Sequence, residues 1–180
     1  METRQALDQF LASVEKRALR MATISTGNTD EALDIVQDAM MKLTTRYGRR
    51  EPAQWGALFH RILQNTITDW HRRQQRQNRW QHWFSRGKED EADDDPIATL
   101  PDTATPEPQT SLQTGASMKV LEHAIHQLPL RQQQALMLRL WEGLSVADTA
   151  QAMGCSQGSV KTHYSRAVNT LRDKLEGHWP

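Results

Sequence analysis

The sequence predicts an all-α fold class, with two small helical domains joined by a flexible acidic linker. Apolar residues recur three and four positions apart over long stretches, which is the period of a helix with one buried side. No segment of useful length alternates with the period of a strand. Between the helical stretches, six of the seven residues from Glu89 to Asp95 are acidic, and four prolines follow. Such a segment cannot build a core. The predicted boundaries are residues 1–77, 78–116 and 117–180.

The first domain is predicted to contain three helices. Apolar spacing places the first over residues 7–19. The second begins at Asn28, which forms a plausible capping box with Glu31, and its apolar stripe covers residues 32–43. A stretch that contains Gly, Pro and several Arg separates it from the third helix. That helix is strongly amphipathic over residues 55–70 and ends in a basic run.

The second domain is predicted to contain four helices in about 60 residues, a compact length for so many elements. Apolar spacing predicts a helix over residues 120–128. Pro129 suits the first position of the next helix, because that position needs no backbone N–H. Gly143 is predicted to cap the end of that helix.

Residues 145–174 have the pattern of a helix-turn-helix. Ser145 and Asp148 can cap the first helix, Gly154 suits the positive φ of the turn, and Ser156 can cap the second helix. One buried stripe is predicted on the second helix: Val160, Ala167 and Leu171. A unit of this kind places its second helix in the major groove of DNA. The alternative is an ordinary pair of helices with a solvated basic face.

The polar side chains of the second helix are therefore candidates for DNA contact. They are Gln157, Ser159, Lys161, Thr162, His163 and Arg166. Those near the start of the helix could reach base edges, whereas Lys161, Arg166 and Arg172 suit phosphates.

The formal net charge is zero, which at first argues against a nucleic-acid binder. The distribution is uneven, however. Residues 1–77 carry 12 Lys and Arg against 9 Asp and Glu, and residues 117–180 carry 7 against 5. Residues 78–116 carry 3 against 8. Two mildly basic domains thus flank an acidic segment that cancels their charge in the total.

Several classes of protein are not favoured by the sequence. Cys155 is the single cysteine, so an intrachain disulfide and a Cys-paired zinc site are excluded. No apolar leader and no membrane-length apolar stretch occurs, which predicts a cytoplasmic protein without membrane insertion. No Gly-rich phosphate loop, nucleophile elbow or His-Glu-x-x-His motif occurs. His123 and His126 are expected to be a solvated pair. We therefore expect no enzyme, no cofactor and no metal.

Four segments together resemble the extracytoplasmic-function sigma factors of bacterial RNA polymerase. Residues 30–43, DEALDIVQDAMMKL, look like region 2.2 of that family. Residues 55–73, WGALFHRILQNTITDWHRR, are similar to regions 2.3 and 2.4. Residues 128–136, LPLRQQQAL, and the helix-turn-helix resemble region 4. The resemblance implies a transcription initiation factor that directs core polymerase to promoters through −10 and −35 recognition and promoter melting.

The resemblance also implies partners and site residues. The implied partners are promoter DNA and core RNA polymerase, through its β′ clamp and β flap, with an anti-sigma factor as a further candidate. Residues implied in polymerase binding are Asp34, Gln37, Asp38 and Met41. Residues implied in −10 binding are Arg49, Arg50, Trp55, His60, Asn65, Arg72 and Arg73.

The residues of this region suit the −10 task, because unpaired bases are held by aromatic or apolar pockets beside cations. Tyr47 and Arg46 precede the third helix closely and fit that description. For Trp55, core packing is the alternative to DNA contact. Three aromatic residues of the predicted linker, Trp80, Trp83 and Phe84, could dock on a neighbouring domain or a partner.

A second function remains open from the residues alone, namely a helix-turn-helix transcription regulator that works without polymerase. Response regulators share this type of helix-turn-helix, but their receiver domain alternates strands and helices. Residues 1–77 show no strand pattern.

Overall fold

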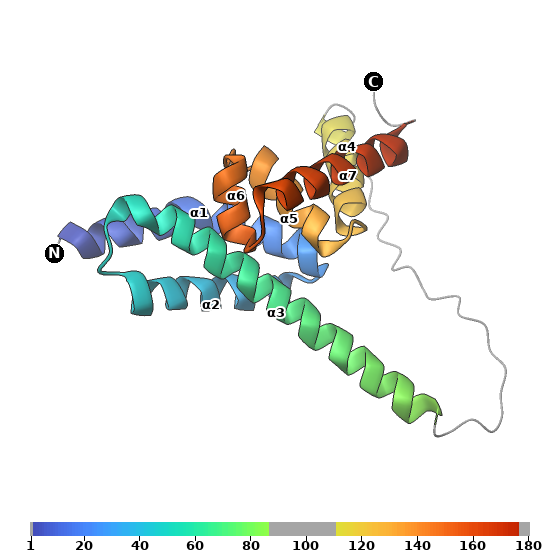
Figure 1. Cartoon of the computed structure of the whole chain (residues 1–180), viewed down its shortest axis with the longest axis horizontal. Helices are drawn as coiled ribbons and strands as arrows, with labels where there is room; N and C mark the ends of the chain where they lie inside the picture. Colours follow the sequence, from blue (N-terminus) through green and yellow to red (C-terminus); the bar gives the residue numbers. More distant parts are fainter. Residues whose placement is uncertain (1, 87–110, 177–180) are drawn as a thin grey trace.

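The protein, seen here as a computed structural model, is described over residues 2–86 and 111–176, and this part is all helical, as predicted (Figure 1). The seven helices of these described residues are α1 (Glu2–Thr26), α2 (Thr29–Tyr47), α3 (Pro52–Arg86), α4 (Ser111–His126), α5 (Leu130–Leu140), α6 (Val146–Met153) and α7 (Gln157–Leu175). The acidic run that was predicted as the centre of the linker, residues 89–95, lies outside the described residues.

The start of α2 confirms one half of the predicted capping box. The side chain of Asn28 accepts hydrogen bonds from the backbone N–H groups of Asp30 and Glu31. The carboxylate of Glu31 has a different partner from the one that a capping box requires, because Nε1 of Trp70 donates to its Oε2 over 2.9 Å. Glu31 therefore ties α2 to α3.

Helix α3 is longer than the sequence analysis expected. Residues 78–86, predicted as linker, continue the helix, and residues 111–116 at the other edge of the predicted linker already belong to α4. The extension has a local cause. Between Gly56 and Gly87 the chain contains no Gly or Pro, and Gln and Arg, which favour helices, are frequent from residue 72 onward. The distal part of α3 projects away from the other helices (Figure 1).

The capping signals of the helix-turn-helix are confirmed. The hydroxyl of Ser145 accepts from the N–H of Asp148, and the hydroxyl of Ser156 accepts from the N–H of Ser159. Gly154 has a φ of 63° at the turn between α6 and α7, a conformation that favours glycine. The predicted stripe on α7 is buried: Val160, Ala167 and Leu171.

The two predictions for the ends of α5 were each wrong by one or two residues. Pro129 is the N-cap of α5 and not its first helical residue. Gly143 does not cap the helix, which ends at Leu140 with Trp141 as the C-cap; Gly143 instead lies in the following turn with a φ of 64°.

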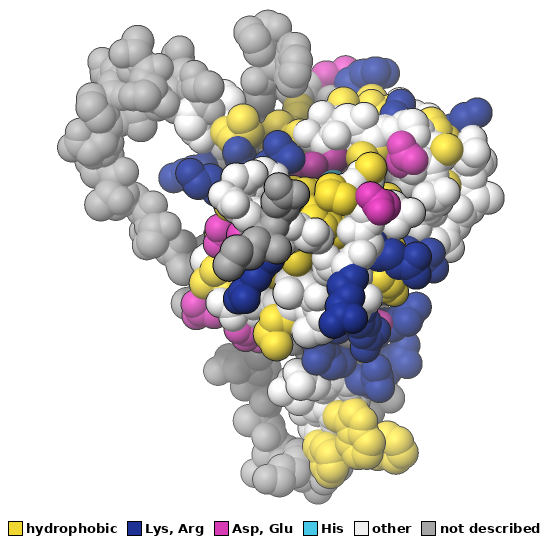
Figure 2. Space-filling view, turned by 90° about the vertical axis from the view of Figure 1, so that its left-hand side faces the viewer, with side chains coloured by type: hydrophobic (Ala, Val, Ile, Leu, Met, Phe, Trp, Pro, Cys, Tyr) yellow, Lys and Arg dark blue, Asp and Glu magenta, His cyan; other side chains and the backbone are white. Residues whose placement is uncertain are grey.

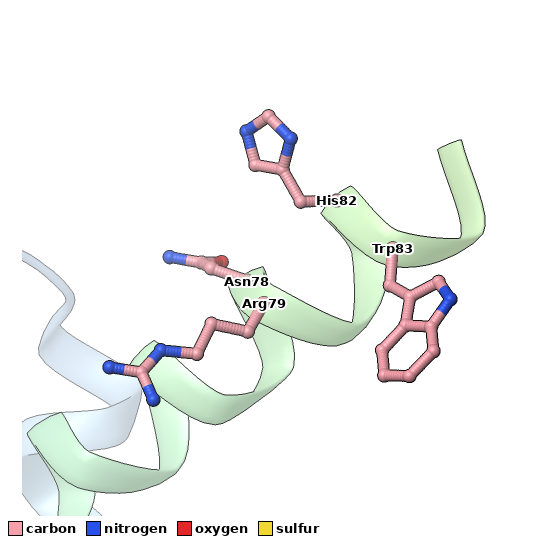
Figure 3. A pocket seen from close by; sticks show the side chains of 4 residues that line it. All are labelled: Asn78, Arg79, His82 and Trp83. Carbon is pink, nitrogen blue, oxygen red and sulfur yellow. The ribbon is translucent and has the colours of Figure 1, made fainter. Parts of the chain in front are cut away.

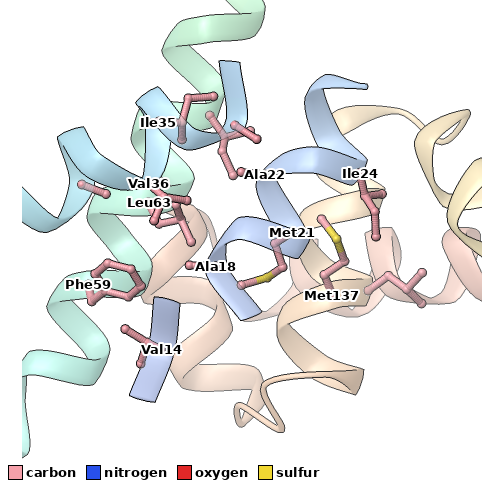
Figure 4. Packing of buried hydrophobic residues seen from close by; sticks show 14 of the residues in the cluster. Val14, Ala18, Met21, Ala22, Ile24, Ile35, Val36, Phe59, Leu63 and Met137 are labelled. Carbon is pink, nitrogen blue, oxygen red and sulfur yellow. The ribbon is translucent and has the colours of Figure 1, made fainter. Parts of the chain in front are cut away.

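The two helical domains pack against each other and share one hydrophobic core, which the sequence did not predict. Ile24 and Met21 of α1 are buried together with Met137 of α5 in the same cluster (Figure 4). Hydrogen bonds cross the same boundary, because Nε2 of Gln134 donates to Oγ1 of Thr68 over 3.1 Å. The helix-turn-helix keeps a smaller cluster of its own: Ala135, Leu138, Ala150, Ala152, Met153 and Val160.

Candidate nucleic-acid interface

A groove with polar and basic walls lies where the end of α2 meets the first half of α3. It has a volume of about 280 Å³ and is lined by Lys42, Arg46, Tyr47, Leu58, Arg61, Ile62, Asn65 and Thr66. Three cations, one aromatic ring and one side-chain amide thus face a single hollow. This is the combination that holds an unpaired base and its phosphates, since the ring can stack, the amide can read a base edge and the cations can neutralise phosphate.

Five of the seven predicted −10 residues are exposed, and one of them lines the groove. Asn65 lines the groove. Arg49 and Arg50 are exposed in the loop between α2 and α3, and Arg72 and Arg73 are exposed further along α3. Arg72 lies 3.9 Å from Asp69 on the surface, where such a pair is too weak to hold the side chain back from a ligand.

Trp55 is a correction to the predicted DNA contacts. Its side chain is 1% exposed and packs beside Phe10, with ring centroids 6.0 Å apart. Its Nε1 donates to the backbone oxygen of Tyr47 over 3.3 Å. Trp55 is therefore a core residue, which was the alternative prediction. Its indole ring is almost completely buried, so a DNA base cannot stack on it.

His60, which was also predicted to contact −10 DNA, is buried in the conformation described and is a second correction. Its side chain is buried, and its Nε2 lies 3.4 Å from a carboxylate oxygen of Glu142, in the turn after α5. The second domain thus covers this residue, and DNA cannot reach it while the two domains stay packed together.

Two residues of the groove, Lys42 and Arg61, were missed. Each has a signal in the sequence that could have found it, because Lys42 precedes Arg46 by four positions and Arg61 precedes Asn65 by four. Side chains four apart share a helix face. Lys42 also forms an ion pair of 2.7 Å with Asp38 in the preceding turn.

The residues predicted to bind polymerase form the outer face of α2. Asp34, Gln37 and Met41 are exposed, Met41 by 66%, and Asp38 is half-buried beside Lys42. An exposed flexible methionine among carboxylates can adapt to an apolar partner surface. The structure thus brings these four residues together on one helix but leaves their partner to be tested.

Most of the predicted DNA contacts on α7 are exposed to solvent. Gln157, Lys161, Thr162 and Arg166 are exposed, whereas Ser159 and His163 are half-buried. Burial lowers the pKa of His163, and the positive charges of Arg131 and Arg166 lower it further. His163 is therefore neutral near pH 7 and adds a hydrogen-bonding group, not a charge, to this face.

The two candidate DNA-binding parts meet in this structure. Arg61 of α3 and Gln157, the first residue of α7, line one hollow beside the turn of the helix-turn-helix. Helix α6 packs along α3. Helix α5 also packs against α1, and Figure 1 shows α6 above the first half of α3, while α7 runs beside α4.

Comparison with known proteins assigns both domains. Residues 7–77 match the family described as "Sigma-70 region 2", and residues 118–171 match "Sigma-70, region 4". An RNA polymerase sigma-E factor from Streptomyces antibioticus is 30% identical over 147 residues, covering 81% of this chain and 71% of the relative. The chain belongs to the extracytoplasmic-function sigma factors. Promoter-specific transcription initiation with RNA polymerase is accordingly its function, and a polymerase-independent regulator is not favoured.

Other relatives agree. The sigma factor SigV of Bacillus subtilis is 28% identical over 161 residues, and the aligned part covers 87% of this sigma factor and 82% of SigV. A solved structure of the sigma factor RpoE from Bartonella quintana, in complex with the anti-sigma factor NepR, has a TM-score of 0.59 at 25% identity. It covers 94% of this sigma factor and 98% of the other chain. None of the described helices has the length and hydropathy of a membrane-spanning segment.

Proposed function

We propose that this sigma factor holds an unpaired −10 strand in the groove between α2 and α3 and reads the −35 element with α7. The outer face of α2 binds the β′ clamp of core polymerase. One observation carries the −10 assignment, namely that Lys42, Arg46 and Arg61 converge with Tyr47 and Asn65 on one groove. Duplex DNA needs only cations along its backbone, whereas a ring and an amide among the cations suit a base that has left the stack.

The conformation described is a closed one, which the promoter complex must open. Arg61 and Gln157 line the same hollow. Promoter elements about two helical turns apart lie roughly 70 Å from one another. Arg61 and Gln157 cannot contact the −10 and −35 elements at the same time while they line one hollow. Region 4 must therefore leave region 2 when promoter DNA is bound at both sites.

The interface between the two regions contains buried polar groups that weaken it. It buries polar groups: Gln64 has neither side-chain amide atom hydrogen-bonded among the described residues, and Nδ1 of His60 also lacks a partner there. Buried polar groups without partners reduce the net stability of a contact. Contacts between domains of one chain commonly resemble transient interfaces for this reason.

A second protein contact is proposed on region 4. An apolar groove of about 570 Å³ lies between α4, α5 and α7, and Leu140 at this groove is 59% exposed. Such a groove accepts the apolar face of a partner helix. We assign it to the β flap of core polymerase. An anti-sigma factor is the competing occupant, since the solved RpoE relative was obtained with one.

The −10 assignment is tested with holoenzyme reconstituted from this sigma factor and core polymerase. Its affinity is measured for a forked promoter, in which the −10 region is single-stranded on one strand, and for the matching full duplex. Arg61→Ala and Asn65→Ala are expected to lose affinity for the fork by about 10-fold each, a loss typical of charged or bidentate contacts. Arg4→Ala, an exposed arginine on α1, is the control. Wild-type affinity in both groove variants would exclude this groove as the −10 site.

A further inference from the structure

The projecting end of α3 carries three large aromatic side chains in water. Trp80 is 61% exposed, Trp83 77% and Phe84 70%. Their rings stack on one another: the Trp80 ring lies 6.4 Å from that of Trp83 at 19°, and 5.8 Å from that of Phe84 at 25°. Figure 2 shows this apolar cluster at the lower tip of the molecule, with Lys and Arg side chains gathered above it. The three residues lie beyond the part that matches sigma-70 region 2, which ends at residue 77.

One member of the aromatic cluster, Trp83, lies on the same face of α3 as the groove, and Trp80 and Phe84 adjoin that face further round the helix. That face carries Arg61, Asn65, Arg72, Arg76, Arg79 and Trp83. Successive members are four, seven, four, three and four positions apart, which keeps them within about 60° of one another around the helix. We call this set the arginine stripe. It begins at the groove and reaches the aromatic cluster roughly 33 Å away.

The side chains near the end of α3 point in different directions. Figure 3 shows His82 and Trp83 pointing away from each other, while the guanidinium of Arg79 reaches back along α3 toward its N-terminal half. Arg76 and Arg79 are exposed, and among the described residues neither forms an ion pair. Cations and aromatic faces are therefore both available to a ligand on one side of the helix.

The composition distinguishes a nucleic acid from other ligands. A helix that lies on a membrane needs an apolar face over several turns, whereas the turns before Trp80 consist mainly of Gln, Asn and Arg. A helix that docks on a protein also presents apolar anchors over several turns. Residues 78–86 contain no Leu, Ile, Val or Met, so their apolar surface is aromatic only. Aromatic faces beside arginines are the elements that stack on successive unpaired bases.

We propose that Trp80, Trp83 and Phe84 form a base-stacking subsite for single-stranded DNA, with Arg76 and Arg79 on the phosphates. The subsite rests on the proposed function, because the arginine stripe leads to it from the proposed −10 groove. A strand held at both ends of the stripe would span about ten nucleotides at the B-form rise. The subsite thus holds an unpaired promoter strand outside the groove and favours the opened promoter over the duplex.

Holoenzyme with the full chain tests the subsite. Its affinity is measured by fluorescence anisotropy for a forked promoter with an unpaired strand of about 15 nucleotides and for the matching duplex. Trp83→Ala is expected to weaken fork binding about 5- to 100-fold, the range for loss of one stacked base, and to leave duplex binding unchanged. Gln81→Ala, in the same exposed turn, is the control.

Two further variants separate stacking from apolar docking. Trp83→Tyr should retain most of the fork affinity, whereas Trp83→Leu should lose it as Trp83→Ala does. Rescue by Leu, or a loss of affinity for core polymerase without DNA, would show that the cluster binds a protein and would overturn the proposal. Unchanged fork binding in Trp83→Ala would also overturn it. If Arg61→Ala still weakens fork binding in that case, the −10 groove stands and only the subsite fails.

Discussion

A carboxylate oxygen of Glu142, in region 4, lies 3.4 Å from Nε2 of His60, in region 2. The other carboxylate oxygen lies 3.2 Å from Nε of Arg17 on α1. The side chain of Glu142 is 5% exposed in this position. Its hydrogen bond with His60 is the main reason that its pKa lies below the ordinary value, and the charges of His60 and Arg17 lower it further, whereas burial opposes the shift. One carboxylate thus holds two helices of region 2.

The first prediction is that Glu142→Gln loosens the closed conformation. The substitution keeps the shape of the side chain but removes the negative charge that lies against both His60 and Arg17. Hydrogen bonds to charged groups contribute about 1.5–3 kcal/mol, and Arg17 is half-exposed and can regain water, so we expect a fall of about 2 kcal/mol in the free energy of unfolding. Urea denaturation measures this value, and small-angle scattering of the free chain should show a larger radius of gyration.

Glu122→Gln is the matched control. Glu122 of region 4 also pairs with region 2, through Arg20 at 2.6 Å, but both side chains are substantially exposed. Exposed pairs contribute little, so the free energy of unfolding should change by less than about 1 kcal/mol. Equal effects of Glu122→Gln and Glu142→Gln would show that the buried position of Glu142 has no special role.

The second prediction concerns pH and His71, which shares a hydrogen bond of 3.0 Å with Ser25. Burial lowers its pKa, and His126 lowers it further, while hydrogen bonding with Ser25 opposes this. Because the unfolded chain then takes up the proton more readily, stability should fall as the pH drops below about 6.5. His71→Gln should reduce the slope, which for one proton cannot exceed about 1.4 kcal/mol per pH unit.

Urea denaturation at pH 7.5, 6.5 and 5.5 measures this slope. His82→Gln, an exposed histidine at the far end of α3, is the control and should leave the slope unchanged. A residual slope is expected in His71→Gln, since the pKa of His163 is also lowered. The assignment to His71 fails if its variant retains the wild-type slope.

The third prediction tests the polymerase face of α2. Asp34→Arg is expected to weaken binding to core polymerase about 10-fold or more, because it reverses a charge on the exposed face that also carries Gln37 and Met41. Glu15→Arg makes the same charge change on the exposed side of α1 and should bind as wild type. Titration of fluorescent sigma factor with core polymerase gives both affinities, and circular dichroism checks the fold.

The fourth prediction divides the surface of α7 by role. Lys161→Ala and Arg166→Ala should each reduce the salt dependence of promoter binding by roughly one phosphate contact. Gln157→Ala and Thr162→Ala should instead change which −35 sequences are used, since hydrogen bonds to base edges carry sequence information. A −35 promoter library transcribed with each holoenzyme measures the change. The same sequence preference in all four variants would exclude base reading by this helix.

Local signals in the sequence were sufficient for the starts of three helices and for the turn of the helix-turn-helix. Asn28, Ser145 and Ser156 cap the helices that they were predicted to cap, and Gly154 has the positive φ that its turn required. These features depend on residues within one turn of each other, so spacing alone reveals them.

The length of α3 was underestimated because residues 78–86 were assigned to the linker. The helix propensity of the Gln and Arg residues in this part of the chain instead continues the helix. Trp55 shows another limit. A tryptophan at the start of an amphipathic helix satisfies both core and ligand patterns, and only its packing on Phe10 and its hydrogen bond to Tyr47 decide between them.

The sequence by itself determined the two helical regions and the apolar stripe of each predicted helix, since these follow from periodicity, and its motifs gave the family through their resemblance to known sigma factors. Only the tertiary structure decided that region 4 closes on region 2, that Glu142 covers His60, and that Arg61 meets Gln157. The physical reason is that such contacts join faces separated by many residues. Their formation depends on the shape, burial and charge of both surfaces together, and no spacing within either helix carries that information.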